Sequence, residues 1–282
     1  MQDLSLKKTG LNSIWNLLST LIKSGIGIVT SLLIARSLGP DLFGSYSYIA
    51  FACGTGAMIA VWGFPLTLTK YVSEYSAQGQ MDVVKALLRF VVKIEIIFSL
   101  LICVGMLSII LGLVKFAYPA WFLLGAIAMF PMMFDWIYGA AIRGIQEYRI
   151  NTRIEFFVSF FQIFGVIMVS YFHLGVPGYL AVMALGAGML VFLRRRIWNA
   201  RFRDVPVIPL DRQIKKEISG YAGIMVINTL LGAVVWERSE VFFLERFSPL
   251  AELSFYSIAY SFAQKISDIP VSLTSAFMPA SS

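Results

Sequence analysis

Long apolar runs separated by short polar or charged segments recur along this chain. Each run is close to the roughly 20 residues that cross a 30 Å hydrocarbon core as a helix. The runs cover residues 12–35, 43–64, 91–114, 120–141, 155–172, 176–193, 218–236 and 253–276. Because lipid offers the backbone no hydrogen-bond partners, continuously apolar segments of this length have to be helical. The pattern predicts an all-α polytopic membrane protein of about eight transmembrane helices.

The composition agrees with lipid as the solvent and offers little for catalysis. Hydrophobic residues make up 58% of the chain and charged residues only 14%, whereas soluble domains carry about 25% charged residues. Cys53 and Cys103 lie inside apolar runs, and the single histidine, His173, ends one. No phosphate-binding loop, metal-ligand cluster or catalytic triad pattern is evident. We therefore expect no catalytic residue, no cofactor and no metal site.

The net charge of +7 is spread between the apolar runs. This distribution favours the positive-inside rule over a nucleic-acid partner. With a cytoplasmic N-terminus, four basic residues fall outside: Arg36, Lys115, Arg238 and Arg246. Seventeen fall inside: Lys7, Lys8, Lys70, Lys85, Arg89, Lys93, Arg143, Arg149, Arg153, Arg194, Arg195, Arg196, Arg201, Arg203, Arg212, Lys215 and Lys216. The bias predicts a multi-pass protein with its N-terminus in the cytoplasm.

Two charged segments have further interpretations. The basic segment 194–216 is explained by topology, and binding of anionic lipid headgroups is an alternative. Lys93 and Glu95, near the inner end of the third run, are expected to extend to the headgroups.

An internal repeat relates residues 40–50 to residues 249–259. At a constant offset, Pro, Ser, Ile and Ala recur, and each copy opens an apolar run. Six predicted spans separate the copies, so both have the same orientation, as in transporters with two parallel halves. We therefore expect a first six-helix transmembrane lobe at residues 1–193 and a basic cytoplasmic linker at 194–217. Residues 218–282 would be the first two helices of a second, truncated lobe.

Three segments carry a family resemblance. Residues 36–44, RSLGPDLFG, follow the first span; residues 143–148, RGIQEY, follow the fourth; and residues 237–247, ERSEVFFLERF, follow the seventh. They resemble polysaccharide flippases of the O-antigen and teichuronic-acid type, in the superfamily that includes multidrug and toxin extrusion transporters. Two six-helix lobes are usual there, so the chain is expected to be a fragment or a truncated gene product.

The resemblance implies a transporter of the bacterial inner (plasma) membrane. It would move an undecaprenyl-diphosphate-linked oligosaccharide from the inner to the outer leaflet by alternating access, for cell-surface polysaccharide such as lipopolysaccharide O-antigen. Implied partners are membrane lipid, the lipid-linked oligosaccharide, and the polymerase and glycosyltransferases of the same pathway. A cation-coupled drug exporter of the same superfamily is an alternative. A membrane-embedded enzyme of envelope polysaccharide assembly is another.

Ionisable residues inside the predicted spans are functional candidates, because each costs at least about 2.5–3.5 kcal/mol at the helix centre. Lys23 lies in the first span, Asp135 in the fourth, and Lys265 and Asp268 share one face of the eighth. The lysines would attract the diphosphate into a central cavity, and either aspartate would couple transport to protons or Na⁺. Alternatively, Lys265 and Asp268 form an internal ion pair and a neighbouring helix caps Asp135.

Asn12 and Asn16 extend the candidate set, because with Ser19 and Lys23 they are spaced to form one stripe along the first span. A polar stripe in a membrane helix faces protein or water. We expect it to line the cavity, with hydrogen bonding to another helix as the alternative.

Overall fold

The computed structural model describes residues 2–112, 119–235 and 240–277. These residues form helices α1 Gln2–Ala60, α2 Phe64–Ala77, α3 Met81–Gly112, α4 Pro119–Gly144, α5 Tyr148–Tyr171, α6 Gly175–Arg201, α7 Arg212–Val235, α8 Glu240–Phe247 and α9 Leu250–Phe277. No strand occurs in the described ranges. The prediction of an all-α membrane protein is therefore confirmed.

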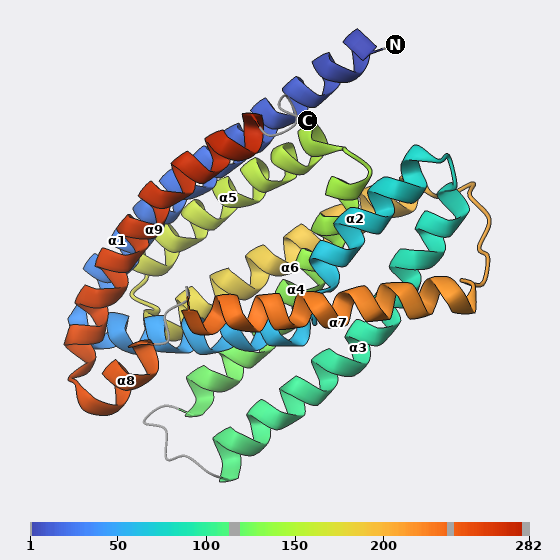
Figure 1. The fold of residues 1–282 in the computed structure, drawn as a ribbon. Helices are drawn as coiled ribbons and strands as arrows, with labels where there is room; N and C mark the ends of the chain where they lie inside the picture. The colour runs from blue at the N-terminus through green and yellow to red at the C-terminus, as the bar shows by residue number, and fades with distance from the viewer. Residues whose placement is uncertain (1, 113–118, 236–239, 278–282) are drawn as a thin grey trace.

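Helix α1 is bent into two arms between the first two predicted spans. Gly39 has φ 74° and ψ 174°, a conformation available to glycine because it lacks a Cβ. Pro40 follows and opens the second arm, where its missing N–H does no harm. The chain changes direction at this point (Figure 1). The two predicted spans 12–35 and 43–64 are therefore the two arms of α1.

Four described segments are long and apolar enough to cross a membrane: Thr20–Ala60, Ala120–Gly144, Tyr148–Tyr171 and Gly175–Arg201. The first is 41 residues long, about twice what one crossing needs. Helix α5 leaves five phenylalanines exposed: Phe156, Phe157, Phe160, Phe161 and Phe164. An apolar face of this kind is expected where a helix meets lipid.

Several helices run beyond the apolar segments that predicted them. The polar stretch 70–89 becomes the end of α2 and the start of α3, joined by a turn at Gly79 with φ 75°. Helix α6 continues past the predicted end of its span at residue 193 to Arg201, and α7 begins at Arg212. Hydropathy identifies only the part of a helix that lies in hydrocarbon. It therefore did not predict the polar ends of these helices.

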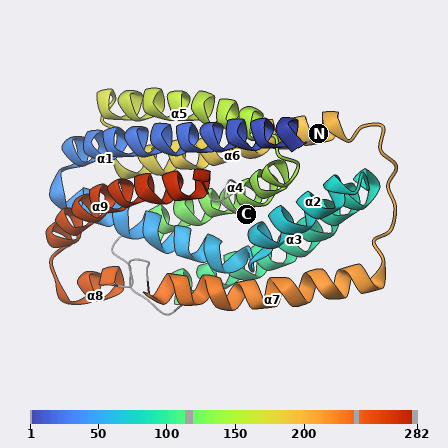
Figure 2. The same ribbon diagram turned by 45° about the horizontal axis from the view of Figure 1, so that its top comes forward.

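The two copies of the internal repeat touch each other. The Ser254 hydroxyl donates a hydrogen bond to the Pro40 carbonyl, and Gly44 faces the Leu250 carbonyl so closely that no Cβ fits there. Ser45 and Ser254, at matching repeat positions, each donate to the carbonyl four residues earlier. Helix α9 lies alongside α1 in both views (Figures 1 and 2). The repeat thus marks a helix–helix contact.

Candidate functional site: a charge cluster beside two polar cavities

Four charged side chains from four helices meet inside the bundle. Arg194 of α6 lies between two carboxylates: it donates through one terminal nitrogen to Asp135 of α4 and through the other to Glu155 of α5 at 2.6 Å. Lys23 Nζ of α1 lies 2.7 Å from the same Glu155 Oε1. Asn151 of α5 accepts a hydrogen bond from Arg194 Nε at 3.1 Å and donates one to Glu155 at 3.0 Å. We call these five residues the charge cluster.

The charge cluster is buried and electrically balanced. Arg194 is only 3% exposed, and Asp135, Asn151 and Glu155 are also buried. Two cations face two carboxylates, so no net charge remains among them. Gly139, one turn from Asp135 on α4, makes room for the guanidinium, because a Cβ there would lie 2.9 Å from Arg194 Nη1. Such an arrangement links α1, α4, α5 and α6, and removing the buried Arg194 would leave Asp135 without a cation inside the protein.

Lys23 differs from the other members because half of its side chain, 50%, is exposed. It lines a cavity of about 300 Å³ between α1, α5 and α6, which we call the lysine cavity. Its other polar lining residues are Thr30, Tyr46, Glu155, Ser159, Gln162 and Tyr179. The buried Tyr179 hydroxyl has no hydrogen-bond partner among the described residues. A buried hydroxyl without a hydrogen bond lowers the stability of the folded protein unless a ligand or a water molecule bonds to it.

A second cavity of about 470 Å³ lies between α1, α4 and α9. Its polar and aromatic lining consists mainly of Thr30, Ser31, Ser47, Thr55, Trp136, Ser257, Ser261 and Gln264, and we call it the hydroxyl cavity. Gly27, Thr30, Ile34 and Tyr46 line both cavities. The two spaces therefore adjoin at the middle of α1's first arm.

The structure brings two of the predicted site residues together. Lys23 and Asp135 belong to one cluster, linked through Glu155 and Arg194. Lys23 lies on a cavity wall, whereas Asp135 lines neither cavity and is held by Arg194 of a neighbouring helix. This geometry matches the alternative in which a neighbouring helix caps Asp135. The side chains of Asn12, Asn16, Lys265 and Asp268 lie outside the described part of the structure, so their roles stay predictions.

Two charged residues have surroundings that the sequence did not indicate. Arg194, counted with the cytoplasmic charge, is buried at the centre of the charge cluster. Glu95 was expected to extend to the headgroups, yet it is 0% exposed and neither carboxylate oxygen has a hydrogen-bond partner within the described ranges. Lys93, two residues earlier, is exposed as expected.

Glu155 and Asn151 were missed, although the sequence held a signal for them. Asn151, Glu155 and Ser159 are four residues apart and therefore fall on one face of α5. The same rule had identified the polar stripe on the first span. All three side chains are buried, so the stripe faces the protein interior and not lipid.

These features define a class: a multi-pass α-helical membrane protein whose interior holds a balanced charge cluster next to polar cavities. Residues 10–282 match the family described as "Polysaccharide biosynthesis protein", and the chain belongs to that family. The match confirms the resemblance to polysaccharide flippases drawn from the sequence. No curated protein and no solved structure matches the chain.

Proposed function

We propose that this protein transports a lipid-linked oligosaccharide, of the undecaprenyl-diphosphate-linked type, from the inner to the outer leaflet by alternating access. The observation that carries the proposal is the pair of adjoining cavities inside the bundle. Their walls present hydroxyl, amide and aromatic groups, which are the partners that a polyhydroxylated sugar needs for hydrogen bonds and stacking. Lys23 adds a cation on the wall, suited to an acidic sugar or a diphosphate.

The charges at the cavities favour this substrate over a hydrophobic cation. A cation exporter needs an acidic wall, and Glu155 is the one carboxylate among the residues that line the two described cavities. Glu155 already pairs with Lys23 and Arg194. The cavity walls therefore carry no unpaired carboxylate for a cation, and drug export is the second candidate.

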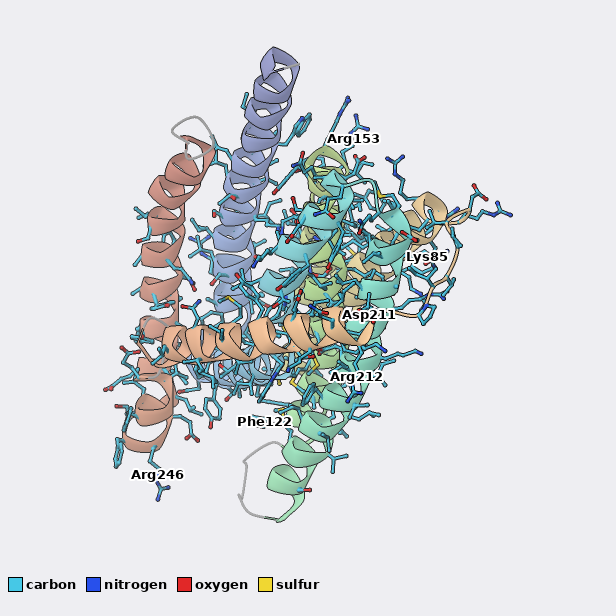
Figure 3. The ribbon with its side chains drawn as sticks, turned by 45° about the vertical axis from the view of Figure 1, so that its right-hand side comes forward. Lys85, Phe122, Arg153, Asp211, Arg212 and Arg246 are labelled. Carbon is cyan, nitrogen blue, oxygen red and sulfur yellow. The ribbon has the colours of Figure 1, made fainter. Side chains whose placement is uncertain are left out.

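The bias of basic residues toward one set of loops supports an N-terminus in the cytoplasm. Arg153, predicted inside, and Arg246, predicted outside, lie at opposite ends of the molecule (Figure 3). In this orientation the substrate arrives from cytoplasmic glycosyltransferases and leaves toward a polymerase on the other face.

The proposal is tested by replacing Lys23 in the full-length protein and measuring surface polysaccharide in a strain that lacks the native gene. Lys23→Met should reduce surface polysaccharide at least tenfold with unchanged protein abundance, because Glu155 keeps Arg194 as its partner. Lys23→Arg, which retains the charge, should restore most of it. Lys216→Met, a lysine remote from both cavities, is the matched control. Normal polysaccharide with Lys23→Met would remove Lys23 from the mechanism.

A further inference from the structure

A third cavity, larger than the lysine and hydroxyl cavities, lies away from the charge cluster, where α3 begins and α6 ends. It measures about 960 Å³, at the upper end of the range for ligand pockets. Six of its lining residues are cationic: Lys85, Arg89, Lys93, Arg195, Arg203 and Lys215. No acidic residue is among its lining residues. We call it the basic cavity.

The cations come from separate segments and converge on one space. Lys85, Arg89 and Lys93 are four residues apart, so they form one stripe on α3. Arg195 comes from α6 and Lys215 from α7. Lys85 has a structural task, because its ammonium donates hydrogen bonds to the carbonyls of Phe202 and Val205 in the α6–α7 connection. Lys85 lies beside that connection in Figure 3, and it holds one wall in place.

The other five cations have no carboxylate partner among the described residues. Like charges brought together in this way repel each other unless an anion joins them. Their convergence therefore points to an anionic ligand. Basic residues that only set the orientation of the protein in the membrane would not need to line a cavity.

The apolar and aromatic residues of the wall indicate what kind of anion fits the basic cavity. Phe90, Val92, Val207 and Ile208 are apolar, and Trp198 stacks on Phe202 with ring centroids 4.2 Å apart. Lys93 lies near the inner end of the apolar run 91–114, and Arg195 lies two residues beyond the end of the run 176–193. Cations at these points lie at the level of the lipid headgroups. The site thus combines several cations with an apolar wall, and the sequence places it beside the ends of apolar runs.

We propose that the basic cavity binds an anionic phospholipid of the surrounding leaflet, with its phosphate held by Arg89, Arg195 and Lys215 and its upper acyl chain against the apolar wall. The proposal needs only the placement of the chain in a membrane and does not depend on what the protein transports. Bound lipid would link α3, α6 and α7, each of which contributes a cation to the site.

Two double variants test the proposal with matched charge. Arg195→Gln with Lys215→Gln removes two cavity cations, whereas Arg196→Gln with Lys216→Gln removes their immediate neighbours, which do not line the cavity. All four residues are exposed, so both variants should fold, as size-exclusion profiles and thermal unfolding would verify. Phosphatidylglycerol is titrated into delipidated full-length protein in neutral detergent, and bound lipid is counted by native mass spectrometry.

The wild type should bind phosphatidylglycerol saturably and at least tenfold more tightly than phosphatidylcholine or inorganic phosphate. The cavity variant should bind about 30-fold more weakly, since each cation near a lipid headgroup contributes roughly fivefold. The neighbouring variant should stay within about twofold of wild type. Equal weakening by both variants would overturn the proposal, as would equal binding of inorganic phosphate. A preference for a polyprenyl diphosphate over phosphatidylglycerol would overturn it as well, because the cavity would then be a substrate site.

Discussion

Arg194 and Arg195 are neighbours on α6, yet they belong to two different regions of the molecule. Arg194 is buried in the charge cluster between Asp135 and Glu155. Arg195 is exposed and lines the basic cavity. Successive helix residues are turned by about 100° from each other, which is enough to direct one guanidinium into the charge cluster and the next into the basic cavity. Adjacent identical residues therefore have opposite consequences for stability and for binding.

The difference lies in whether carboxylates accompany the cations. In the charge cluster each cation faces a carboxylate, so the interior stays neutral and the helices are held together. In the basic cavity the described cations lack acidic partners, which keeps them available to an anion. The charge cluster therefore serves the fold, and the basic cavity is available for ligand binding. Lys23 shares features of both kinds of site, because it belongs to the cluster and also lines a cavity.

The largest effect is expected from Arg194→Met. This change leaves Asp135 buried without its cation, and breaking such a buried network costs about 3–5 kcal/mol. The variant should lose most of its folded population in detergent, as measured by thermal unfolding. Arg195→Met is the matched control and should change stability by less than about 0.5 kcal/mol. Equal stability of the two variants would contradict the assignment of Arg194 to the cluster.

An intermediate effect is expected in a double-mutant cycle of Asp135→Asn and Arg194→Met. Because the two side chains are direct partners, removing both should cost less than the sum of the single changes. We expect a coupling energy of about 1–3 kcal/mol from chemical unfolding. Pairing Asp135→Asn with Arg195→Met gives the control cycle, for which the two effects should simply add. A coupling near zero in the first cycle would mean that the two side chains do not interact in the folded protein.

The smallest effect on stability is expected from Lys23→Met. Lys23 is half exposed, and Glu155 retains Arg194 without it. The loss in unfolding free energy should therefore stay below about 1 kcal/mol, the range of solvated ion pairs. A loss as large as that of Arg194→Met would show that Lys23 is part of the structural core and would void its use as a functional probe.

Much of the fold was predictable because it follows from local sequence. Runs of about 20 apolar residues predict the helical class and the order of the long helices. The Gly39–Pro40 turn lies where such a run is interrupted. The contact between the repeat copies was not visible, since Ser254 and Pro40 are more than 200 positions apart and only packing brings them together.

The site was predictable only in part. Lys23 and Asp135 stood out because charges inside apolar runs are conspicuous. Arg194 was overlooked because hydropathy ended its span one residue earlier, which placed it with the flanking basic residues. Its partners are 39 and 59 positions away, and periodicity along one helix carries no information about such pairs.

In the proposed function, the protein moves a lipid-linked oligosaccharide across the membrane through the two adjoining cavities, one of which Lys23 lines. This function is tested most directly with full-length protein in proteoliposomes that contain a fluorescent lipid-linked oligosaccharide in the donor leaflet. Arrival of the label in the opposite leaflet is followed with a membrane-impermeant quencher. The wild type should transfer the label well above the rate of protein-free vesicles, and Lys23→Met should fall to that background rate. Transfer by the wild type at the protein-free rate, under conditions in which the same protein moves a lipophilic cation, would contradict the account.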